Sequence, residues 1–139
     1  MAKTTDVYSI KTVNNVDGKI GSADTTTKIT VWTAGGDDGV LKSLGLSSTD
    51  TAAAIINVYV NVGGAGTDRL MGAVPVPALS GFNGTLQPVD ALAFLALTSL
   101  DGFGNRTYQA QAGTTIKIAA QVTLTSGKEV DAFGEGGNY

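Results

Sequence analysis

Alternation of apolar and polar side chains is the clearest pattern along this chain. Between residues 50 and 62, apolar side chains occupy every second position, at Ile56, Val58, Val60 and Val62. A period of two is the period of a β-strand with one buried face. We therefore predict a strand over residues 50–62. Residues 69–76 are predicted to return beside it as an antiparallel partner, after the glycine-rich connection at 63–68.

Further segments have the same character. A short strand is predicted at residues 28–32, before a glycine-rich turn, and a second apolar segment follows at 40–46. Residues 114–124 alternate again, and their apolar face comprises Ile116, Ile118, Ala120, Val122 and Leu124. The turn at Ser126-Gly127 separates this segment from a last predicted strand at 129–133.

Prolines limit two of these elements. Pro75 and Pro77 have no backbone N–H to donate, so the strand at 69–76 is predicted to end there or to lie at a sheet edge. Residues 89–97 follow Pro88 and contain the longest apolar run of the chain, at 91–97. This segment fits either a short helix or a buried irregular segment.

Residues 1–25 differ from the rest because their apolar residues are scattered around a turn signal at Asp17-Gly18. This opening segment fits an arm or an edge hairpin, and a mobile tail is the alternative. The chain is accordingly divided into residues 1–25 and a single β domain over residues 26–139.

Short strands separated by glycine-rich turns, without a convincing amphipathic helix, predict an all-β fold. We expect an antiparallel β-sandwich with jelly-roll connectivity and an extended N-terminal segment. A chain of 139 residues is long enough to bury one hydrophobic core. Trp32, the only tryptophan, is expected in that core or at its rim.

The amino-acid composition limits which reactions and metal sites the chain can support. The chain has 19 glycines but no histidine and no cysteine. It therefore lacks the usual proton shuttle at neutral pH, a thiolate nucleophile and the commonest ligands for zinc. Asp37-Asp38 and Glu129 with Asp131 fit a solvated turn and the outer face of a strand, and residues 101–105 fit a hairpin turn better than a calcium loop. We expect no enzymatic activity, cofactor or metal site.

Charge and hydropathy exclude two kinds of partner. Nine basic residues against twelve acidic ones give a formal net charge of -3 and a pI of about 4.6, whereas nucleic-acid binders carry a basic face. Residues 91–97 are the longest apolar run, far short of the roughly 20 residues that a membrane-spanning helix needs. The N-terminus has no apolar secretory signal. We expect synthesis in the cytoplasm, with neither nucleic acid nor membrane as a partner.

Five segments in this order resemble small virion structural proteins of tailed phages, above all capsid cement and decoration proteins. The resemblance covers residues 26–139 and lies in structural motifs rather than catalytic ones. The segments are Lys28 to Trp32, Asp50 to Asn61, Leu70 to Pro77, Asp101 to Tyr108 and Ala132 to Tyr139.

The resemblance implies a non-enzymatic protein that stabilises the phage head by bridging shell subunits. Its partner would be the major capsid protein of the same particle, and its location the capsid surface of the virion after synthesis in the host cytoplasm. A homo-oligomer is implied, with a trimer favoured on a symmetric shell. The candidate subunit contacts are Val7, Tyr8, Ile10, Val13, Phe82, Phe103, Phe133 and Tyr139.

Two alternatives stay open. A component of the tail, neck or fibre would share the same composition and strand pattern, but would be present in fewer copies. A carbohydrate-binding adhesion module is the other, although such modules present several coplanar aromatic rings. Tyr59 and Tyr108 are its candidate sugar-binding side chains.

Overall fold

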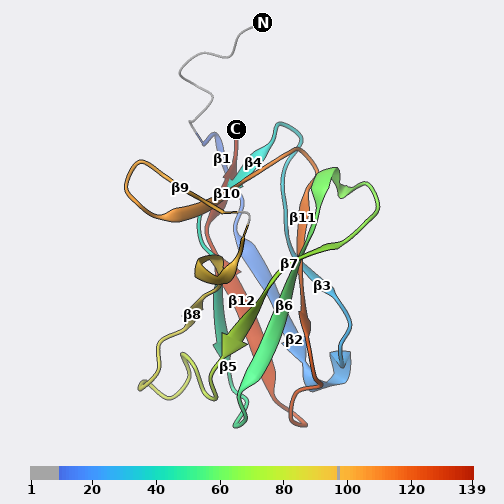
Figure 1. Cartoon of the computed structure of the whole chain (residues 1–139), viewed down its shortest axis with the longest axis vertical. Coiled ribbons are helices and arrows are strands. Elements are labelled where there is room, and N and C mark those ends of the chain that lie inside the picture. Colours follow the sequence, from blue (N-terminus) through green and yellow to red (C-terminus); the bar gives the residue numbers. More distant parts are fainter. Residues whose placement is uncertain (1–9, 97) are drawn as a thin grey trace, which may run out of the picture.

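The computed structural model describes residues 10–96 and 98–139. Within these residues the fold is all-β, with strands in three antiparallel sheets (Figure 1). The strands are β1 Thr12–Val13, β2 Val16–Gly21, β3 Ile29–Thr33, β4 Gly39–Leu41, β5 Gly45–Ser48, β6 Ala54–Asn61, β7 Arg69–Val76, β8 Val89–Asp90, β9 Ser99–Leu100, β10 Arg106–Ala110, β11 Thr115–Ala120, β12 Glu129–Gly134 and β13 Gly136–Asn138. The 3₁₀ turns are η2 Ser22–Asp24, η3 Val62–Gly64 and η4 Ala91–Phe94.

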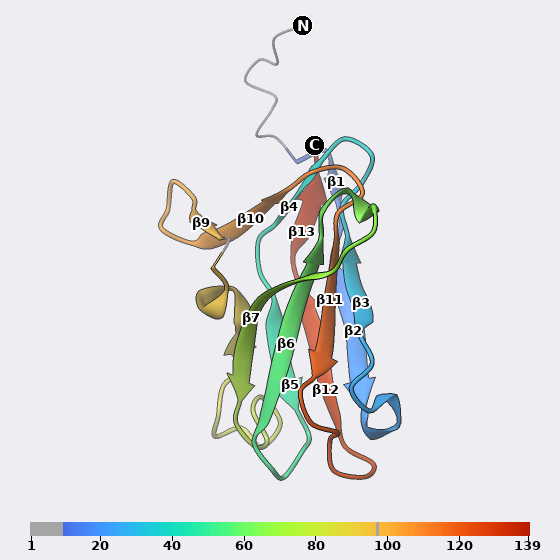
Figure 2. The same ribbon diagram turned by 45° about the vertical axis from the view of Figure 1, so that its right-hand side comes forward.

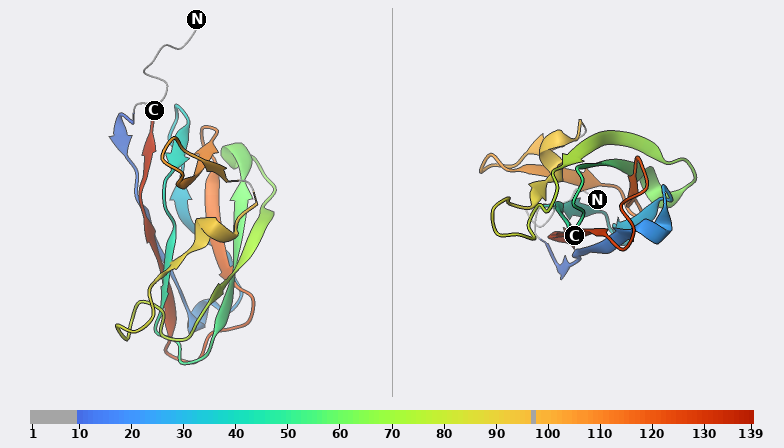
Figure 3. Two further views of the ribbon diagram at one scale, coloured as in Figure 1. Left: turned by 60° about the vertical axis from the view of Figure 1, so that its left-hand side comes forward. Right: turned by 90° about the horizontal axis from the view of Figure 1, so that it is seen from below.

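Two four-stranded sheets form opposite layers. One has the strand order β3-β11-β6-β7 and the other β2-β12-β5-β8. An end-on view shows β6, β7 and β11 on one side of the molecule and β2 and β12 on the other (Figure 3). Fully buried side chains from both sheets join one core, among them Ile20, Leu46 and Val130 from one layer and Ile56, Val58 and Ile118 from the other. The fold is therefore sandwich-like, as the sequence predicts; jelly-roll connectivity stays a prediction.

A third sheet, β1-β13-β4-β10-β9, lies at the end of the molecule that carries the C-terminus (Figure 2). It continues strands of the second layer, because only Glu135 separates β12 from β13 and a short bend at 42–44 separates β4 from β5. The glycine-rich strand β13 was not predicted from the sequence. Its Gly137 has to be glycine because a Cβ there would collide with the Ile10 side chain.

The predicted hairpin is confirmed. β6 and β7 pair antiparallel from Ala54 opposite Val76 to Val60 opposite Arg69. β7 is an edge strand that ends at Val76, as the prolines predict. Residues 91–94 form a 3₁₀ turn, which fits the helical alternative for that segment; Leu97 lies outside the described residues.

Two apolar positions assigned to buried strand faces are wrong. Val62 lies in η3 and Val122 lies beyond β11, and both side chains are exposed. The alternation continues in sequence after the strand has ended. At the end of β6 the cause is Asn61, whose side chain bonds to Asp68 and to the N–H of Gly66 and turns the chain.

The described part of the N-terminal segment, residues 10–25, lies at sheet edges, which fits the edge alternative better than the arm. Thr12 opposes Asn138 and Val16 opposes Gly134, so β1 and β2 follow the C-terminal strands in one register. β2 is an edge strand whose Ile20 is fully buried, which makes it part of the domain and not an arm. The predicted turn at Asp17-Gly18 lies inside β2. Glycine is required there because a Cβ would lie 2.6 Å from Val31 Cγ1.

Candidate binding groove

The hairpin of β9 and β10 projects from the side of the body (Figure 2). Arg106 pairs with Leu100 and Thr107 with Ser99. The Asp101 carboxylate closes the tip by accepting hydrogen bonds from the N–H groups of Phe103 at 2.8 Å and Asn105 at 2.9 Å. Those backbone donors, led by Asn105, lower the pKa of Asp101. The turn predicted at 101–105 is confirmed, and these two hydrogen bonds brace it.

Phe103 stands at this tip with 93% of its side chain exposed, and Leu100 at the base of the turn is 64% exposed. Phe103 therefore does not cover the core of its own domain. Two large apolar side chains on a braced hairpin are costly to leave in water, since burying each of them fully would stabilise the protein by roughly 1.5–3 kcal/mol.

The floor beside this hairpin is the outer face of the five-stranded sheet. Val40 pairs with Gln109 on one side and with Gly137 on the other, so these residues form one row across β10, β4 and β13. Ile10 packs on Gly137. The Tyr139 hydroxyl donates to Gln109 Oε1 at 2.7 Å and so fixes the last residue over the same row.

Together these parts form a depression of about 460 Å³, which we call the terminal groove. Three of the candidate contact residues, Ile10, Phe103 and Tyr139, meet there although they are far apart in sequence. The lining is completed by Val40, Lys42, Ser99, Leu100, Asp101, Gly102, Thr107 and Gln109. The prediction that these three side chains belong to contact surfaces stays a prediction, but the fold places them in one site.

A second depression, of about 450 Å³, adjoins the first, and we call it the polar groove. The two share Lys42, Asp101, Phe103 and Thr107. The polar groove is otherwise lined by Ser43, Asp90, Asn105, Arg106 and Glu135. The main chain of Glu135 is held by the hydroxyl of Ser43, which accepts from its N–H at 2.8 Å, while its side chain is exposed.

The remaining candidate contacts are dispersed. Val13 is exposed on β1, and Phe82 is exposed in the loop between β7 and β8. Phe133 is partly exposed on the outer face of β12, where its ring packs over Gly45. Val7 and Tyr8 lie outside the described residues. Of the described ones, Val13, Phe82 and Phe133 do not line the terminal groove.

The glycine-rich loop at 63–68 is tied to the sheet. Lys117 Nζ lies 3.1 Å from Asp68 Oδ1, and Lys28 Nζ lies 3.3 Å from Asp68 Oδ2. The hydrogen bond from Lys117 is the main cause of the lowered pKa of Asp68, and the bonds from Asn61 and Lys28 add to it. The ion cluster gives this loop a structural role.

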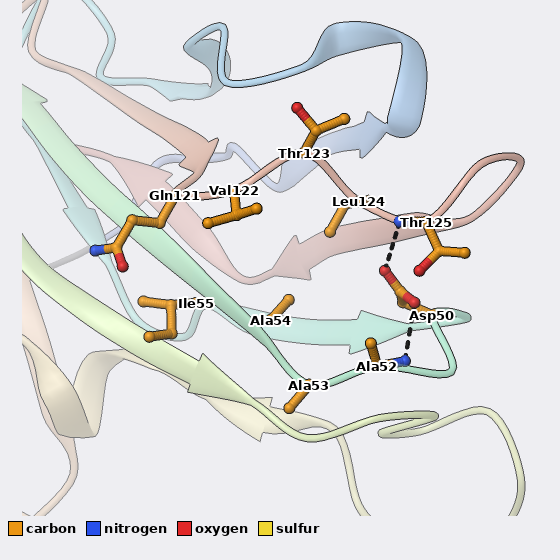
Figure 4. Close-up of a pocket in the computed structure, with 10 residues that line it drawn as sticks. All are labelled: Asp50, Ala52, Ala53, Ala54, Ile55, Gln121, Val122, Thr123, Leu124 and Thr125. Carbon is orange, nitrogen blue, oxygen red and sulfur yellow. Dashed lines mark hydrogen bonds between the residues drawn. The ribbon is translucent and has the colours of Figure 1, made fainter.

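A third and smaller depression, of about 240 Å³, lies where β6 begins and the chain leaves β11 (Figure 4). Ala53 and Ile55 form one wall, and Gln121 and Val122 form the other. At its closed end the Asp50 carboxylate bonds to the N–H groups of Ala52 and Thr125 (Figure 4). Because both carboxylate oxygens are already occupied by the main chain, Asp50 acts as a brace between two loops.

Two of the other acidic side chains singled out in the sequence, Asp38 and Glu129, have structural partners. Asp38 Oδ1 accepts from the N–H of Ala112 at 2.9 Å, so it bridges two turns and is not only solvated. Glu129 pairs with Lys19 at 3.4 Å on the outer face of β12. Burial raises the pKa of the neighbouring Asp131, and the charge of Glu129 raises it further. Over residues 10–96 and 98–139, no group of three or more acidic side chains is placed to hold a metal ion.

Sequence reasoning missed Val40, Leu100 and Gln109 as members of the site. Leu100 alone had a signal, since it is a large apolar residue directly before a turn. Val40 and Gln109 look like ordinary strand residues, and only the pairing of β4 with β10 brings them together. Within the described part of the chain, no helix is both long and apolar enough to span a membrane.

Comparison with known proteins adds no relative. No family model, no curated protein and no solved structure matches the chain.

Proposed function

We propose that this chain is a non-enzymatic structural protein that works by binding other protein subunits, as a capsid cement or decoration protein of a tailed phage. The observation that carries the proposal is the braced β9–β10 hairpin, which holds Leu100 and Phe103 in solvent above a groove. Exposed apolar side chains held in a fixed geometry are typical of protein interaction sites. A rigid hairpin loses little conformational entropy on binding, which favours contact with a second rigid surface.

The proposed partner is the major capsid protein, and the proposed assembly is a homo-oligomer, with a trimer favoured. Many copies on one shell would each bury a modest area. Repetition then turns weak individual contacts into stable attachment. The proposal needs no reaction and no cofactor, in keeping with a chain that has no histidine and no cysteine.

The carbohydrate-binding alternative is less well supported. Tyr108 is buried in the core, so its ring is not available as a sugar platform. The ring of Tyr59 lies under the ammonium group of Lys28, which is 4.3 Å from the ring centroid. The two tyrosines thus do not form a shared exposed surface.

The test is the abundance and position of the chain in purified particles of the phage that encodes it. Quantitative mass spectrometry should find it in copies comparable to the major capsid protein, and cryo-electron microscopy should place it on the outer shell. A copy number close to that of the tail proteins would favour the tail, neck or fibre alternative. Particles that lack the chain altogether would refute both.

Deletion of all of residues 1–25 would not be a suitable test of whether the N-terminal segment takes part in attachment. It would remove β2 together with the buried Ile20. Deletion of residues 1–9 leaves all described strands in place. If residues 1–9 contribute to attachment, this shorter variant should fold normally but detach from particles at lower salt than the full chain. Equal retention would remove these residues from the proposal.

A further inference from the structure

We infer that the terminal groove and the polar groove form one continuous site for an extended protein segment that carries a large apolar side chain close to a lysine or arginine. The inference rests on the proposed function in one respect, namely that the partner is a protein. It adds where the partner binds and which side chains the site selects.

The terminal groove and the polar groove have part of their lining in common. Phe103, Lys42, Asp101 and Thr107 line both depressions, so the two adjoin each other beside the hairpin and one extended segment can contact both. β9 is the edge strand of its sheet. Edge strands present unpaired main-chain groups along their free side, and these can bond to an extended segment.

The terminal groove selects the apolar side chain. Ile10, Leu100, Phe103 and Tyr139 border it, and Val40 lies at its floor. Leu100 and Phe103 are the two most exposed of these and gain most from being covered. An aromatic or long aliphatic side chain of the partner would bury them together, in the manner of a central anchor at an interface.

The polar groove selects the cation. Asp90, Asp101 and Glu135 line it together with Lys42 and Arg106, so negative charge exceeds positive by one unit. The guanidinium group of Arg106 already donates to Thr98 Oγ1 at 3.1 Å. Asp90 Oδ1 accepts from the N–H of Leu92, and Asp101 Oδ1 accepts from two N–H groups of its turn. The ion pairs found among residues 10–96 and 98–139 involve Lys19, Lys28 and Lys117, and none of them includes Asp90, Asp101 or Glu135. A lysine or arginine of the partner would complement this charge.

A random library of linear peptides displayed on yeast, selected on the full chain, tests the inference. The enriched sequences should share an aromatic or long aliphatic residue within a few positions of a lysine or arginine. The affinity of a synthetic consensus peptide is then measured by calorimetry. Phe103→Ser and Leu100→Ser should each weaken binding by about tenfold or more, as expected for anchor residues. Glu135→Lys should weaken it several-fold, and less so at high salt.

Phe82→Ser is the matched control. Phe82 is as exposed as Leu100, but its loop lies at the opposite end of the molecule from the hairpin (Figure 1). This variant should bind the consensus peptide like the unmodified chain. Because Phe82, Leu100 and Phe103 are all exposed, each variant should keep its thermal unfolding midpoint.

Three results would overturn the inference: no enriched consensus, a consensus without a cation, or a consensus peptide that binds Phe103→Ser as well as the unmodified chain. None of these bears on whether particles carry the protein. Decorated particles with no peptide selectivity would therefore refute the groove and leave the proposed function intact. Selective peptide binding by a chain absent from particles would refute the proposed function alone.

Discussion

Asp50 is a residue whose environment decides its role. Only 2% of its surface is exposed, yet its carboxylate accepts hydrogen bonds from the N–H of Ala52 at 2.9 Å and of Thr125 at 3.0 Å. Burial by itself would raise the pKa of Asp50, but these bonds outweigh it and the pKa is lowered. The charged form is therefore the one that stabilises the fold.

We predict a pH-dependent loss of stability that depends on Asp50. A lowered pKa means that its contribution is fully present above the ordinary value of 3.8 and is lost as the pH falls through the folded-state pKa. Asp50→Asn should cost about 2 kcal/mol in the free energy of unfolding at neutral pH, because one main-chain donor loses its charged acceptor. Urea denaturation between about pH 6 and pH 3 should show the two proteins converging as the pH falls.

Asp37→Asn, in an exposed turn, serves as the control and should leave both stability and its pH dependence close to those of the unmodified chain. A constant difference between Asp50→Asn and the unmodified chain at every pH would contradict the assignment.

At the scale of elements, β2 shows how pairing turns a weakly patterned segment into part of the core. Its six residues have only Val16 and Ile20 as large apolar side chains. Both are buried because β12 pairs with β2 along its whole length. Gly18 completes the arrangement by leaving room for Val31 of β3. Residues 16–21 have no apolar–polar alternation strong enough to predict that this segment is a core strand.

We therefore predict that Ile20→Ala lowers the free energy of unfolding by about 3 kcal/mol, since it removes a fully buried side chain. Ile55→Ala makes the same chemical change on the exposed face of β6 and should cost less than about 1 kcal/mol. Chemical denaturation of the two variants measures both losses in the free energy of unfolding. Equal costs would mean that β2 is not part of the cooperative core.

At the scale of the whole molecule, the three sheets share one core. Trp32 and Val58 from one four-stranded sheet, Ile20 from the other, and Leu41 and Tyr108 from the five-stranded sheet all belong to a single cluster of buried side chains. The Trp32 indole N–H also donates to the Asn14 carbonyl at 3.0 Å, which links β3 to the bend between β1 and β2. The end of the molecule that carries the grooves is thus packed onto the same interior as the sandwich.

Unfolding should accordingly be a single transition. Trp32 is the only tryptophan, so its fluorescence reports on this junction, while far-ultraviolet circular dichroism reports on all strands. We predict that both signals change at the same denaturant concentration. Loss of the Trp32 signal before that of the strands would show that the five-stranded sheet opens separately.

The sequence alone determined that the fold is all-β and antiparallel, and it determined the positions of several strands, including β7 at residues 69–76 and its place at a sheet edge. Those features follow from local alternation and from proline chemistry, which act within a few residues. The resemblance to phage virion proteins also marked Ile10, Phe103 and Tyr139 as candidate contacts.

Only the tertiary structure decided where strands stop, which segments pair, and which side chains share a groove. Val122 continues the alternation of its strand but lies exposed beyond it, and Gly136 and Gly137 form a strand with no apolar pattern at all. The groove arises because β4 lies between β10 and β13, which joins residues from both ends of the chain. Such contacts depend on pairing between distant segments, and no period within one segment encodes them.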